Sequence, residues 1–458
     1  GTVVSTTSWF DRETDETEDM ETFLNFVGNL AFGISVPPLE SPVSTIEQYE
    51  SLTHETRFTS SFEGNWQFTA GIFYADAEWD HEYPASFQVG LYDAAVAGFG
   101  EFGLPPEAIQ DCSIDGPLIC IQPSDLIFVT QTITKVEEIA VFGEVTYEFD
   151  ERWSVTAGGR WYDTQVEATS TADGFANTGF TSYAAKQDES GFNPKIMAEM
   201  VLNDDMNFYA SASKGFRVGG INGNLPLGLC GEELDAKNIN PAETVTYDSD
   251  ELWSYELGFK SSLANNRVTF NAAVYFIDWT DMQQQNRLGC GFQFVANAGE
   301  AESRGFEFEL AGAITDSLTG TLGVGYTDAE ITDTGDVPGL EKGDTILGVP
   351  DWTANGSLEY LFPMMGEWEG MLRADANYYG ESTTAPTGDV VVRDDWSTLN
   401  LRAGMLNDSW EVIMFADNVT DERANLSDNR SIAANMPGRA RVITNRPRTI
   451  GVEARLRF

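Results

Sequence analysis

The last ten residues, Thr449-Ile-Gly-Val-Glu-Ala-Arg-Leu-Arg-Phe458, alternate between apolar and polar side chains. The alternation has a period of two, which is typical of a β-strand and not of a helix. One face of this strand is apolar and the other carries charge. The apolar face comprises Ile450, Val452, Ala454, Leu456 and Phe458, and the charged face comprises Glu453, Arg455 and Arg457. Such a strand fits between an oily surface and a wet one.

The same alternation recurs along the chain, for example from Trp66 to Tyr74, from Trp253 to Lys260 and from Trp368 to Tyr378. No helical apolar period of useful length accompanies it, so the sequence predicts an all-β fold with about sixteen strands. The expected strands are residues 2–12, 54–62, 66–76, 135–149, 153–167, 191–202, 206–218, 251–263, 268–280, 297–314, 318–329, 350–362, 368–380, 395–406, 410–418 and 448–458.

Short and long links alternate between these strands. Short turns are expected near 63–65, 150–152, 203–205, 264–267, 315–317, 363–367 and 407–409, and long links at about 13–53, 77–127, 168–190, 219–250, 281–296, 330–349, 381–394 and 419–447. Up-and-down strands place all long links on one rim and all short turns on the other, which indicates a transmembrane antiparallel β-barrel. A soluble β-propeller is disfavoured, because the sequence has neither a repeat of about 40–50 residues nor a WD or kelch signature.

Aromatic residues cluster at the expected strand ends. Trp66, Trp153, Phe208, Trp368 and Trp410 follow short turns, and Trp253, Trp279, Trp352 and Trp396 lie beside long links. Two girdles of aromatic residues, one at each end of the strands, are typical of the two membrane–water interfaces of a barrel. Aromatic residues that only favour strands would instead be scattered along them.

The composition excludes several classes of function. The chain has 26 Lys and Arg against 73 Asp and Glu, a formal net charge of −47, which disfavours binding to nucleic acid. Two isolated His and four Cys without Cys-x-x-Cys spacing do not indicate a structural zinc site. No cofactor motif is present, and no apolar run approaches the 18 residues or so of a transmembrane helix.

The charged residues are unevenly distributed. An acidic run is expected in the first long link and is interpreted as a solvated surface. The alternative is a divalent-cation site, but the run has no EF-hand-like spacing. The run comprises Asp11, Glu13, Asp15, Glu16, Glu18, Asp19 and Glu21. The final 38 residues instead carry eight Arg against four acidic residues. In a barrel, inward-facing Arg would line the lumen and could meet acidic groups of something held inside it.

All four cysteines fall in expected long links. Cys112 and Cys120 share one link, whereas Cys230 and Cys290 lie in consecutive long links that neighbouring hairpins bring side by side. Of the three possible pairings, this order favours Cys112–Cys120 and Cys230–Cys290. Disulfides in exposed loops would fit an oxidising compartment outside the cytoplasm, and four unrelated thiols are the alternative.

The sequence offers little for catalysis. His54 lies at an expected strand start and His81 in an expected loop, and there is no Gly-x-Ser-x-Gly, phosphate-binding Gly loop or His-Glu-x-x-His motif. Nothing nominates a nucleophile and a base, so we do not expect an enzyme.

Several segments resemble the C-terminal barrel of TonB-dependent outer-membrane receptors. They include Asn207-Phe-Tyr-Ala-Ser-Ala-Ser-Lys-Gly-Phe-Arg-Val-Gly-Gly-Ile-Asn222, Tyr255-Glu-Leu-Gly-Phe-Lys260, Phe270–Met282, Asn297-Ala-Gly through Glu309, and Phe415-Ala-Asp-Asn-Val-Thr-Asp-Glu-Arg423. Phe458, as the last residue of a strand, resembles the signal that the barrel-assembly machinery reads. The segments follow the family's order over about residues 54–458.

The resemblance implies a bacterial outer-membrane protein that takes up a scarce solute, of the siderophore, cobalamin or oligosaccharide class, with energy supplied through TonB. Family members have a plug inside a 22-stranded barrel. We therefore expect residues 1–458 to be a partial barrel domain, monomeric and without the plug through which TonB acts. A passive sixteen-stranded porin is the alternative, and a non-transporting adhesin or phage-binding surface is a third.

Five residues are candidate ligand contacts. Trp79, Tyr83, Phe99 and Phe102 are aromatic residues of one long link, and Arg217 ends an expected strand. The aromatic residues would stack on a sugar or a siderophore, or else pack within their own loop. Arg217 would meet an anionic ligand, or else pair with a neighbouring carboxylate.

Overall fold

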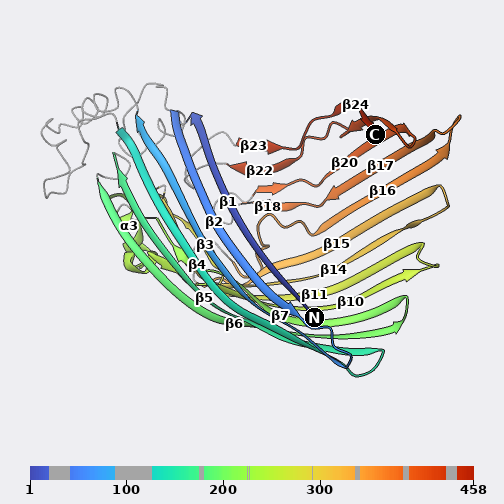
Figure 1. Ribbon diagram of the computed structural model, residues 1–458. Coiled ribbons are helices and arrows are strands. Elements are labelled where there is room, and N and C mark those ends of the chain that lie inside the picture. Colours follow the sequence, from blue (N-terminus) through green and yellow to red (C-terminus); the bar gives the residue numbers. More distant parts are fainter. Residues whose placement is uncertain are drawn as a thin grey trace, which may run out of the picture.

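The computed structural model describes residues 1–19, 42–87, 126–174, 180–223, 225, 227–290, 292–335, 341–384, 391–429 and 441–457. Most of these residues belong to one sixteen-stranded antiparallel sheet, in which neighbours in the sheet follow one another along the chain (Figure 1). This confirms the predicted all-β fold and the number of strands. The sheet consists of β1 (Thr2–Asp19), β2 (Pro42–Thr59), β3 (Trp66–Phe87), β4 (Leu126–Glu148), β5 (Trp153–Asp173), β6 (Thr181–Asn203), β7 (Met206–Arg217), β10 (Asp250–Leu263), β11 (Val268–Thr280), β14 (Glu300–Ala313), β15 (Leu318–Asp333), β16 (Trp352–Pro363), β17 (Glu369–Tyr379), β20 (Trp396–Leu406), β21 (Trp410–Asp417) and β24 (Thr449–Leu456).

The sheet has one apolar and one polar face, as the alternation predicts. Apolar side chains line up across neighbouring strands, and the exposed fractions along one such row are 55% for Ile72, 51% for Val141, 45% for Trp161 and 56% for Phe192. Large apolar side chains left this exposed indicate a surface that meets lipid.

The opposite face carries ion pairs. Arg160 of β5 pairs with Glu138 of β4 and lies over the ring of Phe73 on β3. Near the chain's end, the Nη2 atom of Arg457 lies 3.0 Å from Oε2 of Glu411. Of the arginines expected in the lumen, Arg455 and Arg457 therefore pair with carboxylates of the wall itself, Glu411 and Glu453.

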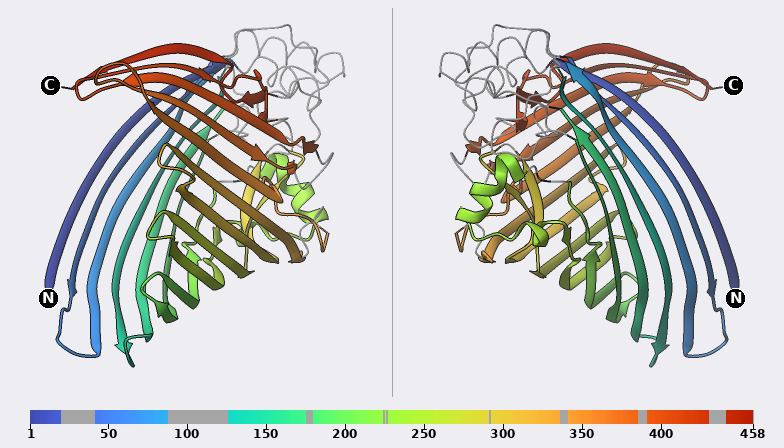
Figure 2. Two further views of the ribbon diagram at one scale, coloured as in Figure 1. Left: turned by 90° about the vertical axis from the view of Figure 1, so that its right-hand side faces the viewer. Right: turned by 90° about the vertical axis from the view of Figure 1, so that its left-hand side faces the viewer.

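The sheet curves into a trough (Figure 2), and we call its apolar face outer and its polar face inner. β1 and β24 are its two edges, and no ladder joins them within the described part of the chain. The N- and C-terminal ends of these edge strands lie apart at the short-turn end of the sheet (Figures 1 and 2). Each edge presents unpaired backbone groups along its strand.

β1 to β6 extend well beyond their predicted lengths, so the expected links 13–53, 77–127 and 168–190 are partly strand. The acidic run from Asp11 to Glu21 was predicted to lie in a loop. This prediction is wrong for Asp11 to Asp19, which are part of β1. Trp79 and Tyr83 likewise lie on β3 and not in a loop. The outer face of these extensions is acidic: Asp11 lies opposite Glu50, which lies opposite Glu78.

The two predicted girdles of aromatic residues at the strand ends are only partly present on the lipid-facing side. Trp66, Trp153 and Trp410 begin strands on the outer face at the short-turn end, and Trp352 packs against Tyr326 on the outer face at the other end. Trp279 and Trp396 are exceptions. Strand register places them on the inner face, opposite Leu252 and Tyr379 respectively.

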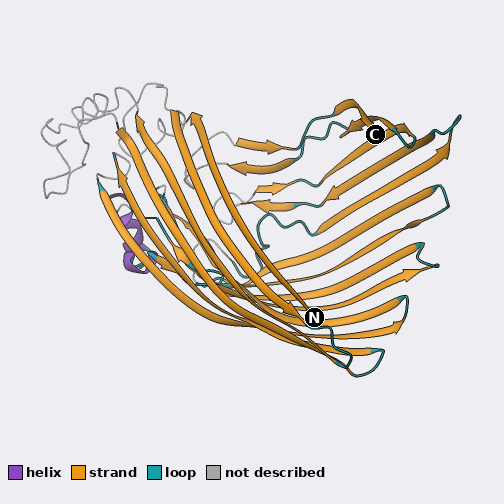
Figure 3. Ribbon diagram, viewed as in Figure 1, coloured by secondary structure: helices purple, strands orange, loops and turns teal. Residues whose placement is uncertain are grey.

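The long links contain structure that periodicity did not predict (Figure 3). They form helix α3 (Leu227–Ala236), the 3₁₀ turn η3 (Pro241–Thr244) and four two-stranded hairpins. The hairpins pair β8 (Gly220–Ile221) with β9 (Thr246–Tyr247), β12 (Gln283–Arg287) with β13 (Gln293–Asn297), β18 (Ser382–Thr384) with β19 (Val391–Arg393), and β22 (Asn425–Asn429) with β23 (Arg441–Thr444). Of the helices that the structure describes, none has the length and apolar character to cross a bilayer.

Candidate functional site

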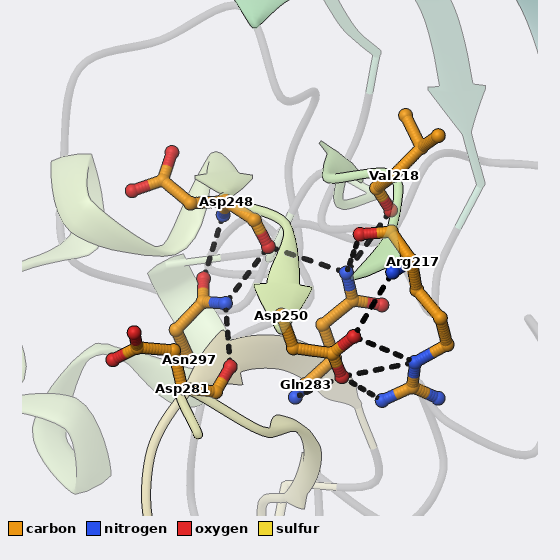
Figure 4. Close-up of polar contacts among 7 residues, drawn as sticks. All are labelled: Arg217, Val218, Asp248, Asp250, Asp281, Gln283 and Asn297. Carbon is orange, nitrogen blue, oxygen red and sulfur yellow. Dashed lines mark hydrogen bonds and ion pairs between the residues drawn. The ribbon is translucent and has the colours of Figure 1, made fainter. Parts of the chain in front are cut away.

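At the long-loop end of the sheet, Arg217 and Asp250 close the base of one loop. Arg217 is the last residue of β7 and Asp250 the first of β10. The Nε atom of Arg217 donates to both carboxylate oxygens of Asp250, at 3.1 and 2.9 Å, and Nη2 donates to Oδ2 (Figure 4). The Asp250 side chain is only 2% exposed, so the ion pair with Arg217 offsets the cost of burying it. The Arg217 side chain remains 51% exposed and lies over the ring of Trp279.

Two amide side chains join this loop to the next one (Figure 4). Nε2 of Gln283 donates to the carbonyls of Val218 and Asp248, at 3.0 and 3.2 Å. Nδ2 of Asn297 donates to the carbonyls of Asp248 and Asp281, at 2.8 and 3.0 Å, and its Oδ1 accepts from the Asp248 N–H. The bases of the two loops are therefore hydrogen-bonded to each other as well as to the sheet.

The Gly-Gly-x-Asn segment explains how the first loop folds inward. A Cβ on Gly219 would lie 2.5 Å from the backbone carbonyl oxygen of Tyr247, so only glycine allows this approach. Asn222 is 7% exposed; its Nδ2 donates to the carbonyls of Thr244 and Val295, and its Oδ1 accepts from the Val295 N–H at 2.7 Å. β8 thereby contacts the inner side of β5 and β6, and β9 contacts β13.

The wall holds this loop through β6. Glu189 accepts from the N–H of Gly219 at 3.2 Å and from that of Ser249 at 2.7 Å. Gln187 donates to the Tyr247 carbonyl at 2.9 Å and to a carboxylate oxygen of Asp248 at 3.0 Å. Burial raises the pKa of the Tyr247 hydroxyl, although the nearby Arg217 opposes the rise, so this tyrosine stays neutral.

A disulfide completes the connection. Cys230 of α3 is bonded to Cys290, with Cα atoms 5.3 Å apart, which is the pairing that the loop order favours. Around it Leu225, Leu234, Leu288 and Phe294 form a small buried cluster. The described residues of 218–249 and 281–299 therefore form one block, which we call the two-loop unit.

A second feature lies on the inner face where β1 to β3 rise above the apolar band. Phe10, Tyr49, Trp79, His81 and Tyr83 share this face, and we call them the aromatic wall. Tyr49 lies directly opposite Trp79, and the ring of His81 is 5.5 Å from that of Trp79 and 4.8 Å from that of Tyr83. Trp79 is 43% exposed. Such a surface can stack on a planar ring or attract a cation.

Charged groups border the aromatic wall. Nδ1 of His81 lies 3.2 Å from Oε1 of Glu47, an approach without hydrogen-bond geometry. Nη2 of Arg12 lies 3.6 Å from Oε2 of the same carboxylate. The Glu47 carboxylate therefore lies between the guanidinium of Arg12 and the ring of His81.

The structure tests the candidate contacts unevenly. Trp79 and Tyr83 lie together on one face, whereas Arg217 belongs to the two-loop unit and pairs with Asp250, the alternative that the sequence left open. Phe99, Phe102, Cys112, Cys120 and Phe458 lie outside the described residues. Sequence reasoning missed the clamp residues Asp250, Gln283, Asn297, Asn222 and Glu189. The only signals for them were the Gly-Gly-x-Asn and Asn-Ala-Gly segments.

We predict that Asp250→Asn loosens the two-loop unit. The change removes a buried charge that accepts from Arg217, and a hydrogen bond to a charged group contributes about 1.5–3 kcal/mol. Hydrogen exchange of amides 217–221 and 283–297 should become at least tenfold faster. Asp235→Asn, at an exposed position of α3, is the control and should leave exchange unchanged. Unchanged exchange in Asp250→Asn would contradict this role for the pair.

Glu233 should make the two-loop unit sensitive to acid. Burial raises the pKa of its carboxyl, but hydrogen bonds from Lys237 and from the backbone of Gly289 and Cys290 outweigh burial and hold the pKa below its ordinary value of 4.5. The stabilisation is thus present above about pH 4.5 and is lost as the pH falls through the lowered pKa. Protection of the Cys290 amide should fall as the pH drops below about 4.5, and Glu233→Gln should abolish that pH dependence. An identical pH profile in both proteins would refute it.

Comparison with known proteins identifies the family. The family model described as TonB dependent receptor-like, beta-barrel, matches residues 3–420. The metal-pseudopaline receptor CntO of Pseudomonas aeruginosa strain UCBPP-PA14 is 26% identical over 251 residues, which are 54% of this chain and 31% of that protein. The probable TonB-dependent siderophore receptor PiuA of Acinetobacter baumannii is 23% identical over 302 residues, 63% of this chain and 37% of that protein. The chain thus spans about a third of the length of these relatives.

Solved structures show the same fold. The ferric yersiniabactin uptake receptor FyuA from Yersinia pestis superposes with a TM-score of 0.70 at 16% identity, covering 91% of this chain and 55% of that one. The siderophore receptor PiuA from Acinetobacter baumannii superposes with a TM-score of 0.67 at 17% identity, covering 99% and 61%. The superpositions show the fold, and the family model favours a receptor barrel over a porin. The chain belongs to the TonB-dependent receptor family, and its sheet is a β-barrel wall of the Gram-negative outer membrane.

Proposed function

We propose that this chain forms part of the barrel wall and of the extracellular mouth of a receptor. This receptor takes up a metal–siderophore complex with energy from TonB. The family supports the transport role, since its members bind ligands such as siderophores and interact with TonB. The names of the relatives support the ligand class, because they are receptors for metal-pseudopaline and for siderophores. Cobalamin and oligosaccharides, which the sequence left open, are named in none of these.

The observation that carries this proposal is the pairing of a solvent-facing aromatic wall with a loop block that is fixed in advance. Trp79 offers an exposed ring on the inner face. The two-loop unit is held by a disulfide, by the side-chain amides of Gln283 and Asn297, and by a buried ion pair. Because it is already ordered, it loses little conformational entropy when a ligand binds. A receptor that captures a dilute solute benefits from a mouth of this kind.

We further propose that residues 1–458 are part of a larger barrel. The unpaired edges of β1 and β24 cannot remain open in hydrocarbon, where each unsatisfied backbone group costs several kcal/mol. Additional strands would pair with these edges, and a plug would supply the contact with TonB. The complete protein would be a monomer whose partners are outer-membrane lipid, a small-molecule ligand, the TonB complex and, through Phe458, the barrel-assembly machinery.

The function can be tested by uptake of radioactive iron. The complete protein is expressed in a host without other siderophore receptors and supplied with ferric hydroxamate, catecholate or carboxylate complexes. We expect one class to be taken up, and only while TonB and the proton gradient are intact. Trp79→Leu should weaken uptake roughly two- to tenfold, because an aromatic contact contributes about 0.5–1.5 kcal/mol. Trp161→Leu, on the lipid-facing side, should not.

Two results would contradict the proposal. Uptake that persists without TonB, together with an open channel in planar bilayers, would indicate a passive porin. Equal uptake by Trp79→Leu and Trp161→Leu would remove the aromatic wall from ligand capture while leaving the transport class intact.

A further inference from the structure

A groove of about 500 Å³ lies on the apolar face of the sheet, away from the mouth. It crosses six neighbouring strands, β15, β16, β17, β20, β21 and β24. Its lining is almost wholly aliphatic, with Ala374, Ala403 and Ala416 among larger side chains. These larger side chains are Leu318, Leu358, Tyr360, Leu372, Leu401, Met414 and Ile450.

Strand register explains why the surface is hollow here. One row across the sheet runs Leu358, Ala374, Leu401, Ala416 and Ile450, and the next row runs Tyr360, Leu372, Ala403, Met414 and Val452. Each alanine is flanked by a long side chain on at least one neighbouring strand. Three recessed positions between such side chains leave a channel where a uniform wall would be smooth.

The groove belongs to the lipid side of the wall. Arg373 and Arg402 also border it, but their charged ends turn to the opposite face, where Arg373 pairs with Asp375 and Glu359 and Arg402 pairs with Asp417. The exposed side chains of Leu358, Leu372 and Leu401 are continuous with the rest of the apolar band.

Its height along the strands places it in one leaflet. Leu372 and Ala374 lie within the first six residues of β17, and Leu401 and Ala403 within the last six of β20. Both segments adjoin the short turns, which face the periplasm in outer-membrane barrels. At the turn end, Tyr360 stacks near Phe362, and tyrosine at such a level sits among lipid headgroups.

We propose that this groove holds one acyl chain of a phospholipid from the periplasmic leaflet. The chain would lie over the three alanines, with its ester end near Tyr360. Lipid tails are as apolar as leucine, so no hydrophobic gain drives this binding. Retention comes from van der Waals contact, which a groove increases by surrounding the chain on several sides.

The test is native mass spectrometry of the complete protein extracted from outer membranes in mild detergent. Ala403→Phe and Ala374→Leu fill the groove from two different strands. Ala272→Leu is the matched control, since Ala272 lies on the same apolar face between Phe259 and Phe308. Heat-modifiable gel mobility shows that each variant has folded.

We expect wild type and Ala272→Leu to retain one phospholipid, and the fraction of protein carrying it to fall at least threefold in both groove variants. A folded Ala374→Leu protein alone suffices if Ala403→Phe does not assemble. Equal retention in all four proteins would overturn the proposal. Loss of a lipid A adduct or of a second copy of the protein, in place of a phospholipid, would overturn it equally.

Discussion

Backbone hydrogen bonding in hydrocarbon is the constraint on which the rest of this structure depends. Because no water is available there, each N–H and C=O of the wall must find a partner on a neighbouring strand. The antiparallel ladders from β1 to β24 supply these partners and fix side chains to alternate faces. A single residue step therefore separates Leu372, which faces lipid, from Arg373, which pairs with Asp375 and Glu359 inside. Lipid contact and a charged lumen follow from the same geometry.

This constraint also explains which parts of the fold the sequence could predict. Where a strand separates oil from water, the contrast between its faces is strong, and strands such as β11 (Val268–Thr280) were predicted at their observed bounds. Above the lipid band the contrast disappears, because both faces are wet. There the outer face carries Glu50, Asp76 and Glu78, and the extensions of β1 to β6 were read as loops.

The mouth was predictable only where order along the chain implies closeness in space. Consecutive long links brought Cys230 to Cys290, and the end of one strand placed Arg217 near the start of the next. Asp250, Gln283 and Asn297 could not be identified in this way, since polar residues in loops show no periodicity. Their importance comes from carbonyls that lie close only after the two loops fold together. The groove on the outer face is equally hidden, because it depends on register across six strands.

The central claim is that one face of each strand touches lipid and the other touches water. Spin labels placed one at a time at positions 372 to 377 of β17, in the protein reconstituted in bilayers, measure this directly through collisions with dissolved oxygen and with a water-soluble nickel chelate. We expect oxygen accessibility to be high at 372, 374 and 376 and nickel accessibility to be high at 373, 375 and 377. Accessibilities that do not alternate, or that alternate in the opposite phase, would contradict the account.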